Sequence, residues 1–304
     1  MKLPAFGMAI ALLAGPVVAA ADQLDDTFQF LKQAVEKKDP AMVKKLALEI
    51  SPLVKAVVSA PQPDEEEAKA LWAGRIEYAK AAGLFAEYGL FAVGIQSAAE
   101  TMVDLISTLE EQNPKSQYLD QAYGPYLLAL KQTGASAKIP AVTERALANF
   151  PDNEDLILVM IDTAVSRKQS DRALTYANRL AGVLSHHPKP ENMTAAEWER
   201  KRNASLAHAY WTAGAISFEK GQYVAADKNL RALLPLIAGN SAMAGQALFQ
   251  LGVANYQLGK MTASKAKIVE AAKLSEQSAA IEGPFAEQAR HNALVMKQEA
   301  AQMR

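Results

Sequence analysis

The chain has 304 residues, with 32 basic residues, 33 acidic residues and no cysteine. The absence of cysteine excludes disulfides, thiolate zinc sites, a thiol nucleophile and a lipid-anchored lipoprotein. A net charge of −1 lacks the basic excess that nucleic-acid binding requires, and a chain of this length exceeds one ordinary globular core.

The N-terminus has the pattern of a cleaved signal peptide. Lys2 supplies a positive charge, residues 6–14 are apolar, and Gly15-Pro16 is expected to break the helix that they form. Ala19-Ala20-Ala21 fits the small-x-small cleavage rule, so the mature chain is expected to begin near Asp22. We therefore expect a periplasmic or secreted protein without stable membrane insertion after cleavage. A short membrane anchor or a buried helix is the alternative.

Nearly every later segment follows the helical period, and no strand pattern occurs. Asp39-Pro40 is expected to begin a helix with proline in its first position. The prolines in residues 60–64 forbid regular helix there. Asp64 is expected to cap the next helix, with Glu65 to Glu67 in its first turn, where acidic side chains are favourable. A cation site at these glutamates is the alternative.

Further helix breaks are expected at Asn113-Pro114 and at Phe150 to Asn153. The polar stretch from Ser185 to Thr194 predicts a loop. Thr194 to Glu197 then has the capping-box pattern and predicts a new helix. The basic run Arg200 to Arg202 on this helix is either a solvated face or a contact for an acidic partner or lipid headgroups.

A glycine spacing repeats in the C-terminal half. Gly214, Phe218, Gly221 and Tyr223 recur 38 residues later as Gly252, Tyr256, Gly259 and Met261. A fixed period of two helices and a turn is typical of a helical solenoid. The first glycine of each set is expected to let two helices approach closely. The second is expected to permit the left-handed conformation that ends a helix.

On these residues the chain resembles the tetratricopeptide repeat family. The matching positions are Tyr210, Ala213, Gly214, Gly221, Tyr223, Ala226 and Leu230 in one repeat, and Leu248, Leu251, Gly252, Gly259, Ser264 and Ile268 in the next. Weaker copies run from Tyr123 to Pro151 and from Ile157 to Leu180. Leu127 and Ile161 stand at their first-glycine positions. The resemblance implies an exported bacterial member with an all-α fold, a right-handed α-solenoid of about a dozen helices in stacked antiparallel pairs.

The breaks and repeats divide the chain into six expected parts. They are a cleaved signal peptide at 1–21, divergent helical pairs at 22–115, degenerate repeats at 116–184, a loop insertion and helix start at 185–203, two clearer repeats at 204–282 and a C-terminal capping helix at 283–304.

No motif for a nucleophile, a phosphate cradle or a zinc hydrolase occurs. Glu/Asp pairs are abundant, but none is singled out as an acid/base pair. We therefore expect no enzyme activity, no cofactor and no metal. His186 and His187 are adjacent, and Glu191 is the nearest candidate for a third ligand. A solvated loop is the expected structure, and a metal site is the alternative.

The resemblance also implies that a partner lies in a concave groove, lined mainly by the first helix of each pair. The groove residues implied are His208, Trp211, Ala215, Phe249, Val253, Tyr256 and Gln257. Core packing is the alternative for Trp211, Phe249 and Tyr256. Ala215 and Val253 stand where family members that bind a terminal carboxylate have asparagine, so an apolar or aromatic-rich peptide is the expected ligand.

These observations predict a non-enzymatic scaffold that binds a protein or peptide in the cell envelope. Two alternatives remain at this stage. One is the helical portion of a cell-wall enzyme, and the other is a purely structural spacer.

Overall fold

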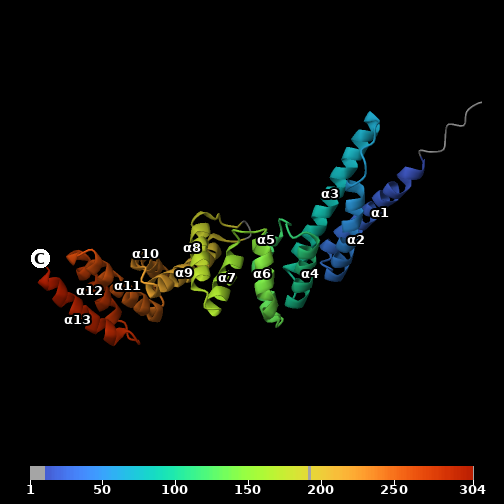
Figure 1. The fold of residues 1–304 in the computed structure, drawn as a ribbon. Helices are drawn as coiled ribbons and strands as arrows, with labels where there is room; N and C mark the ends of the chain where they lie inside the picture. Colours follow the sequence, from blue (N-terminus) through green and yellow to red (C-terminus); the bar gives the residue numbers. More distant parts are fainter. Residues whose placement is uncertain (1–10, 191–192, 304) are drawn as a thin grey trace, which may run out of the picture. The chain divides into compact units, whose positions relative to one another are not determined.

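The computed structural model describes residues 11–190 and 193–303, with side chains from residue 23 onward. These residues form thirteen α-helices and two short 3-10 helices, without a strand (Figure 1). The expectation of an all-α fold is confirmed. The predicted signal peptide at 1–21 and its cleavage position lie outside the residues whose side chains are described. Within the described part of the chain, no helix combines the length and apolarity needed to cross a bilayer.

The chain forms two compact units. The first holds residues up to 142 together with 148–150, and the second holds 143–147 and 151–304. This boundary falls inside the stretch 116–184, which the sequence predicted as consecutive degenerate repeats. The cores are built mainly from helices that follow one another in the chain, with further contacts between α1 and α3, α7 and α9, and α11 and α13.

The helices of the first unit are α1 (Ala11–Glu36), α2 (Pro40–Val58), α3 (Glu66–Gly94), α4 (Ala99–Gln112), α5 (Leu119–Gln132) and the 3-10 helix η1 (Ser136–Lys138). Helix α6 (Ile139–Leu147) belongs in part to each unit. Those of the second unit are α7 (Glu154–Ser166), α8 (Ser170–His186), α9 (Ala195–Glu219), α10 (Tyr223–Leu233), the 3-10 helix η2 (Leu234–Ile237), α11 (Ser241–Met261), α12 (Lys265–Ala279) and α13 (Ala286–Gln302).

Most helix starts predicted from capping residues and prolines agree with the structure. Asp39 caps α2, because its side chain accepts a hydrogen bond from the backbone N–H of Met42. Asp64 does not cap α3, contrary to the prediction. The helix begins at Glu66 after Glu65, and no side-chain cap is formed. The breaks expected before α5 and before α7 are both present, and Asn153 caps α7. Helix α1 runs through Gly15-Pro16, where a break was predicted. A proline inside a helix removes one backbone donor and crowds the carbonyl four residues earlier, yet α1 continues past Pro16.

The loop after α8 is shorter than predicted. Helix α8 continues to His186, so Ser185 and His186 are helical, and the loop begins at His187. The predicted capping box is confirmed. The Thr194 hydroxyl accepts from the Glu197 backbone N–H, and the Glu197 carboxylate accepts from the Thr194 backbone N–H. The hydroxyl and backbone bonds from Thr194 hold the pKa of Glu197 below its ordinary value.

Two of the three basic side chains at the start of α9 form contacts within the protein. The Lys201 ammonium lies 3.0 Å from a Glu154 carboxylate oxygen and 2.8 Å from one of Asp155. Burial alone would lower the pKa of Lys201, but the two carboxylates outweigh it and raise that pKa. Arg202 donates to the Leu184 carbonyl at 2.8 Å. Two of the three charges therefore anchor α9 to α7 and α8 and are not displayed for a partner.

Five helix hairpins share one turn geometry. The residue in the left-handed conformation is Lys38, Gly134, Lys168, Gly221 or Ala263. The backbone N–H of the following residue reaches back five positions in each turn: Asp39 to Ala34, Ala135 to Leu130, Gln169 to Ala164, Gln222 to Ser217 and Ser264 to Gly259, at 2.8 to 3.0 Å. This bond is the signature of the Schellman motif, which satisfies the last carbonyls of a helix. The same left-handed turn therefore recurs after five helices, whether or not it contains glycine.

The predicted role of Gly259 is wrong. Gly221 ends α9 with a φ of 69°, as expected, but α11 continues past Gly259 to Met261, and Ala263 is the left-handed residue. The two turns are therefore 42 residues apart, not 38. The equal seven-residue spacing within the two glycine pairs has a different origin in each pair. Seven residues make nearly two helical turns, so Gly252 and Gly259 lie on one face of α11. Gly221, in contrast, lies beyond the end of α9.

Gly214, Gly252 and Gly259 all permit close helix packing. A β-carbon at Gly214 would lie 2.7 Å from the Leu230 side chain, and one at Gly259 would lie 2.6 Å from Ile268 Cγ1. At Gly252 it would lie 2.5 Å from Ser275 Oγ. Two other positions assigned to the repeat, Tyr223 at the start of α10 and the fully buried Ala226, lie in the α9–α10 hairpin. The expectation of close approach is therefore confirmed at both first glycines.

Candidate functional site

An open groove lies between α11 and α13 in the second unit, with a volume of about 310 Å³. Its lining residues are Val253, Tyr256 and Gln257 from α11, and Gln288, His291, Asn292, Val295 and Met296 from α13. Three of the seven predicted groove residues are thus brought together at one concave surface. The α13 residues at 288, 291, 292 and 295 follow the i, i+3, i+4, i+7 spacing that places them on one helix face.

Tyr256 closes the groove on one side by bonding across to α13. Its hydroxyl donates to the Glu299 carboxylate. This bond raises the pKa of Tyr256, and burial and the Glu299 charge raise it further. The Lys260 ammonium lies 5.4 Å from the centre of the Tyr256 ring, within cation–π range. The ring is therefore held from both helices, while part of its face stays exposed to the groove.

A buried polar network holds α11 in place behind the groove. Asn255 is fully buried and donates to Asp227 on α10 at 2.5 Å and to the Leu251 carbonyl at 3.0 Å. Arg231 joins Asp227 at 2.8 Å to Glu270 of α12 at 2.7 Å. Burial would lower the pKa of Arg231, but the two carboxylates raise it. The network fixes the rotation of α11, and with it the direction in which Val253, Tyr256 and Gln257 project.

The other predicted groove residues lie elsewhere. Phe249 packs its ring on Phe285, which precedes α13, with ring centres 5.1 Å apart. Trp211 is half-buried and packs against the core between α10 and α11, and Phe218 packs against the same core. Core packing, the alternative considered for Trp211, thus accounts for much of its surface.

His208 and Ala215 do not line the α11–α13 groove. Both are half-buried on α9. His208 Nε2 lies 3.0 Å from a carboxylate oxygen of Asp162 on α7, an ion pair whenever the imidazole is protonated. These residues belong to a different part of the second unit from the groove.

The sequence does not predict the α13 half of the groove, because residues 283–304 have only the pattern of a capping helix and the expected groove residues lie on α9 and α11. The signal was present, because Gln288, His291, Asn292 and Val295 form one face of mixed polarity. Nothing local to α13 says, however, that this face lies opposite Tyr256.

The adjacent histidines do not act together. His187 Nδ1 lies 3.4 Å from a Glu154 carboxylate oxygen, and its ring meets Trp198 edge-on, with ring centres 5.8 Å apart. His186 Nδ1 instead lies 2.8 Å from the hydroxyl of Ser185 on its own helix. Among the residues that the structure describes, no group of three His, Asp or Glu side chains is placed to hold a metal ion.

No protein-family model matches the chain, and no curated protein matches it. Among solved structures, one match is a chain from a study of computationally designed, self-assembling cyclic protein homooligomers. It is 14% identical, and the match covers 96% of each chain with a TM-score of 0.25. A similarity at this level carries no argument about fold or function.

Proposed function

We propose that this chain is a non-enzymatic scaffold of the cell envelope, and that it binds a protein or peptide partner in the α11–α13 groove. In this proposal the helix hairpins continue into a right-handed superhelix like that of tetratricopeptide repeat proteins. The chain is exported, and its signal peptide is removed near Asp22.

One observation carries the proposal: the groove combines apolar walls with side-chain amides. Val253 and Val295 supply apolar surface, while Gln257, Gln288 and Asn292 supply amides. Each amide has both a donor and an acceptor, which matches the alternating N–H and C=O groups of a peptide backbone. Gln288 and Asn292 already bond to each other at 3.0 Å, so the pair is ordered before a partner arrives.

The test is site-specific photo-crosslinking in exported protein. A benzoyl-phenylalanine replaces Gln257, and the matched control carries it at Val269, which is exposed on α12 outside the groove. We expect one discrete adduct from position 257 and none from position 269. Adding Asn292→Ala to the position-257 variant should reduce the adduct, because half of the amide pair is removed. Equal adducts from both positions, or none from position 257, would contradict the groove assignment.

Two further measurements address the rest of the proposal. N-terminal sequencing of exported protein should begin within a few residues of Asp22, and a retained Met1 would contradict export. Purified protein should release no soluble fragments from peptidoglycan. Release of fragments would favour the alternative of a cell-wall enzyme, whereas a folded protein without any adduct would favour a structural spacer.

A further inference from the structure

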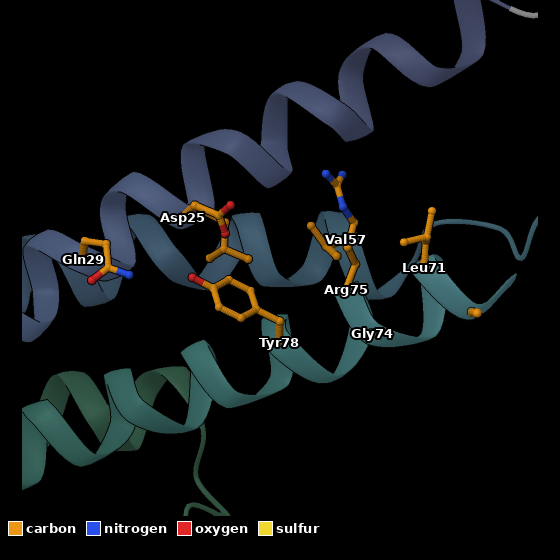
Figure 2. Close-up of a pocket in the computed structure, with 9 residues that line it drawn as sticks. Asp25, Gln29, Val57, Leu71, Gly74, Arg75 and Tyr78 are labelled. Carbon is orange, nitrogen blue, oxygen red and sulfur yellow. The ribbon is translucent and has the colours of Figure 1, made fainter. Parts of the chain in front are cut away.

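A second hollow, of about 500 Å³, lies in the first unit between α1, α2 and α3 (Figure 2). Its apolar lining is Leu24, Val57, Ala70 and Leu71. Leu24 and Val57 are buried and form the floor, while Leu71 is 74% exposed at the rim. The volume falls in the range of about 300–1,000 Å³ that is typical of small-molecule sites.

Four polar side chains share this hollow. Figure 2 shows Arg75 and Tyr78 extending from α3 toward α1, which carries Asp25 and Gln29. Tyr78 and Asp25 line the hollow together, and the pKa of Tyr78 is raised first by burial and then by its interaction with the Asp25 carboxylate.

Arg75 lines the same hollow but forms no ion pair with Asp25 or with any other described side chain. A guanidinium and a carboxylate therefore face one space from two helices without neutralising each other. Complementary charges in a partly apolar site favour a ligand that supplies the missing partner of each.

Gly74 lines the hollow from α3. A β-carbon at this position would have no atom within 4 Å, although Gly74 lies in the interior of α3. Glycine is less favourable than other residues inside a helix, so its presence here costs stability without relieving any clash. The loop before α3 is held in place as well, because Trp72 Nε1 donates to the Ala60 carbonyl at 3.2 Å.

We propose that this hollow binds a small zwitterion with an apolar side chain, either a free amino acid or a short peptide with free termini. The ligand's ammonium pairs with Asp25, and its carboxylate pairs with Arg75. Its apolar side chain packs on Leu24 and Val57. A fatty acid has no cationic group to pair with the Asp25 carboxylate, so an anionic amphiphile fits the hollow less well.

The proposal is tested by calorimetric titration of the full chain with the dipeptide Leu-Leu. We expect saturable binding of one dipeptide. N-acetyl-Leu-Leu, which lacks the ammonium, and Leu-Leu amide, which lacks the carboxylate, should each bind about tenfold more weakly or worse, because each loses a charge-assisted contact. Free leucine, titrated in parallel, distinguishes an amino acid from a peptide as the ligand.

Variants assign the two charges. Asp25→Asn should bind Leu-Leu and N-acetyl-Leu-Leu equally, and Arg75→Gln should bind Leu-Leu and Leu-Leu amide equally. Gly74→Leu should fill the hollow and abolish binding, while its melting temperature stays at or above that of the wild type. Glu77→Gln, on the same helix and outside the hollow, should bind as the wild type does.

Three results would overturn the proposal. They are no saturable binding of leucine or Leu-Leu at millimolar concentration, equal binding of the blocked and free dipeptides by the wild type, and unchanged binding by folded Gly74→Leu. Because the hollow and the α11–α13 groove belong to different units, these outcomes are independent of the crosslinking result.

Discussion

At the scale of single residues, replacing a glycine of this chain with alanine can lower or raise the stability, depending on the atoms that surround the glycine. Gly259 faces α12, and an added β-carbon would lie 2.6 Å from Ile268 Cγ1 and 3.1 Å from the Ile268 backbone nitrogen. Backbone cannot move aside as easily as a side-chain tip. Gly182 is exposed on α8, and a β-carbon there would have no atom within 4 Å.

We predict that Gly259→Ala destabilises the protein by about 1–3 kcal/mol through overpacking. The matched variant Gly182→Ala should stabilise it by about 0.5–1 kcal/mol, because alanine is the better helix former. Urea unfolding followed by circular dichroism measures both. An unchanged midpoint for Gly259→Ala would mean that α11 and α12 do not pack as described.

A second prediction concerns the Tyr256 hydroxyl. Tyr256→Phe removes the donor to Glu299 and should cost about 1 kcal/mol at neutral pH. The folded-state pKa of Tyr256 is raised. The stabilisation is therefore fully present below the unfolded pKa and is lost as pH rises through the folded value. The stability difference between wild type and variant should thus shrink at alkaline pH. A difference that stays constant there would exclude this bond as its cause.

At the scale of elements, five of the turns between helices contain a left-handed residue, and in three of them that residue is not glycine. Lys38, Lys168 and Ala263 adopt a conformation that costs residues other than glycine about 1–2 kcal/mol. The surrounding Schellman bonds and the packing of each hairpin outweigh this cost. These turns are therefore strained positions at which glycine is the better residue.

Accordingly, Ala263→Gly should raise stability by about 1 kcal/mol, because it removes the left-handed penalty. The opposite sign is expected at Ala73, which is exposed within α3, where Ala73→Gly should cost about 1 kcal/mol. Thermal melts of the two variants beside the wild type give the comparison. Equal losses for both substitutions would show that residue 263 is not left-handed in solution.

At the scale of the whole molecule, the second unit has its own cores. The buried clusters of α7 to α9, of α9 to α12 and of α11 to α13 draw their residues from within that unit. A helical array in which each element packs mainly on its neighbours does not need distant parts of the chain to fold.

We therefore predict that a fragment of residues 139–304, which retains the whole of α6, folds by itself. Its circular dichroism spectrum should be helical, and its melt should be cooperative. Amide exchange in α11 should match that of the full chain. A non-cooperative melt, or faster exchange in α11, would show that the second unit depends on the first.

The sequence by itself determined those helix boundaries and turns that depend on interactions within a few residues. Prolines and capping side chains set helix boundaries, because they act through bonds within a few residues, as Asp39 and Thr194 do. Gly221 predicts its turn from the sequence, since glycine is the residue that adopts positive φ without strain.

Only the tertiary structure decided the rest. Ala263 and Lys168 turn because hairpin packing outweighs their own preference, so no local pattern marks them. The spacing from Gly214 to Gly221 equals that from Gly252 to Gly259, but the second glycines have different roles. Gly221 forms a turn, whereas Gly259 lies inside α11, and this difference is visible only once the end of α11 is known. The α13 wall of the groove, and the presence of Asp25 and Arg75 around one hollow, depend on contacts between helices distant in sequence. Those contacts are set by how whole faces pack, which the order of residues within one helix does not specify.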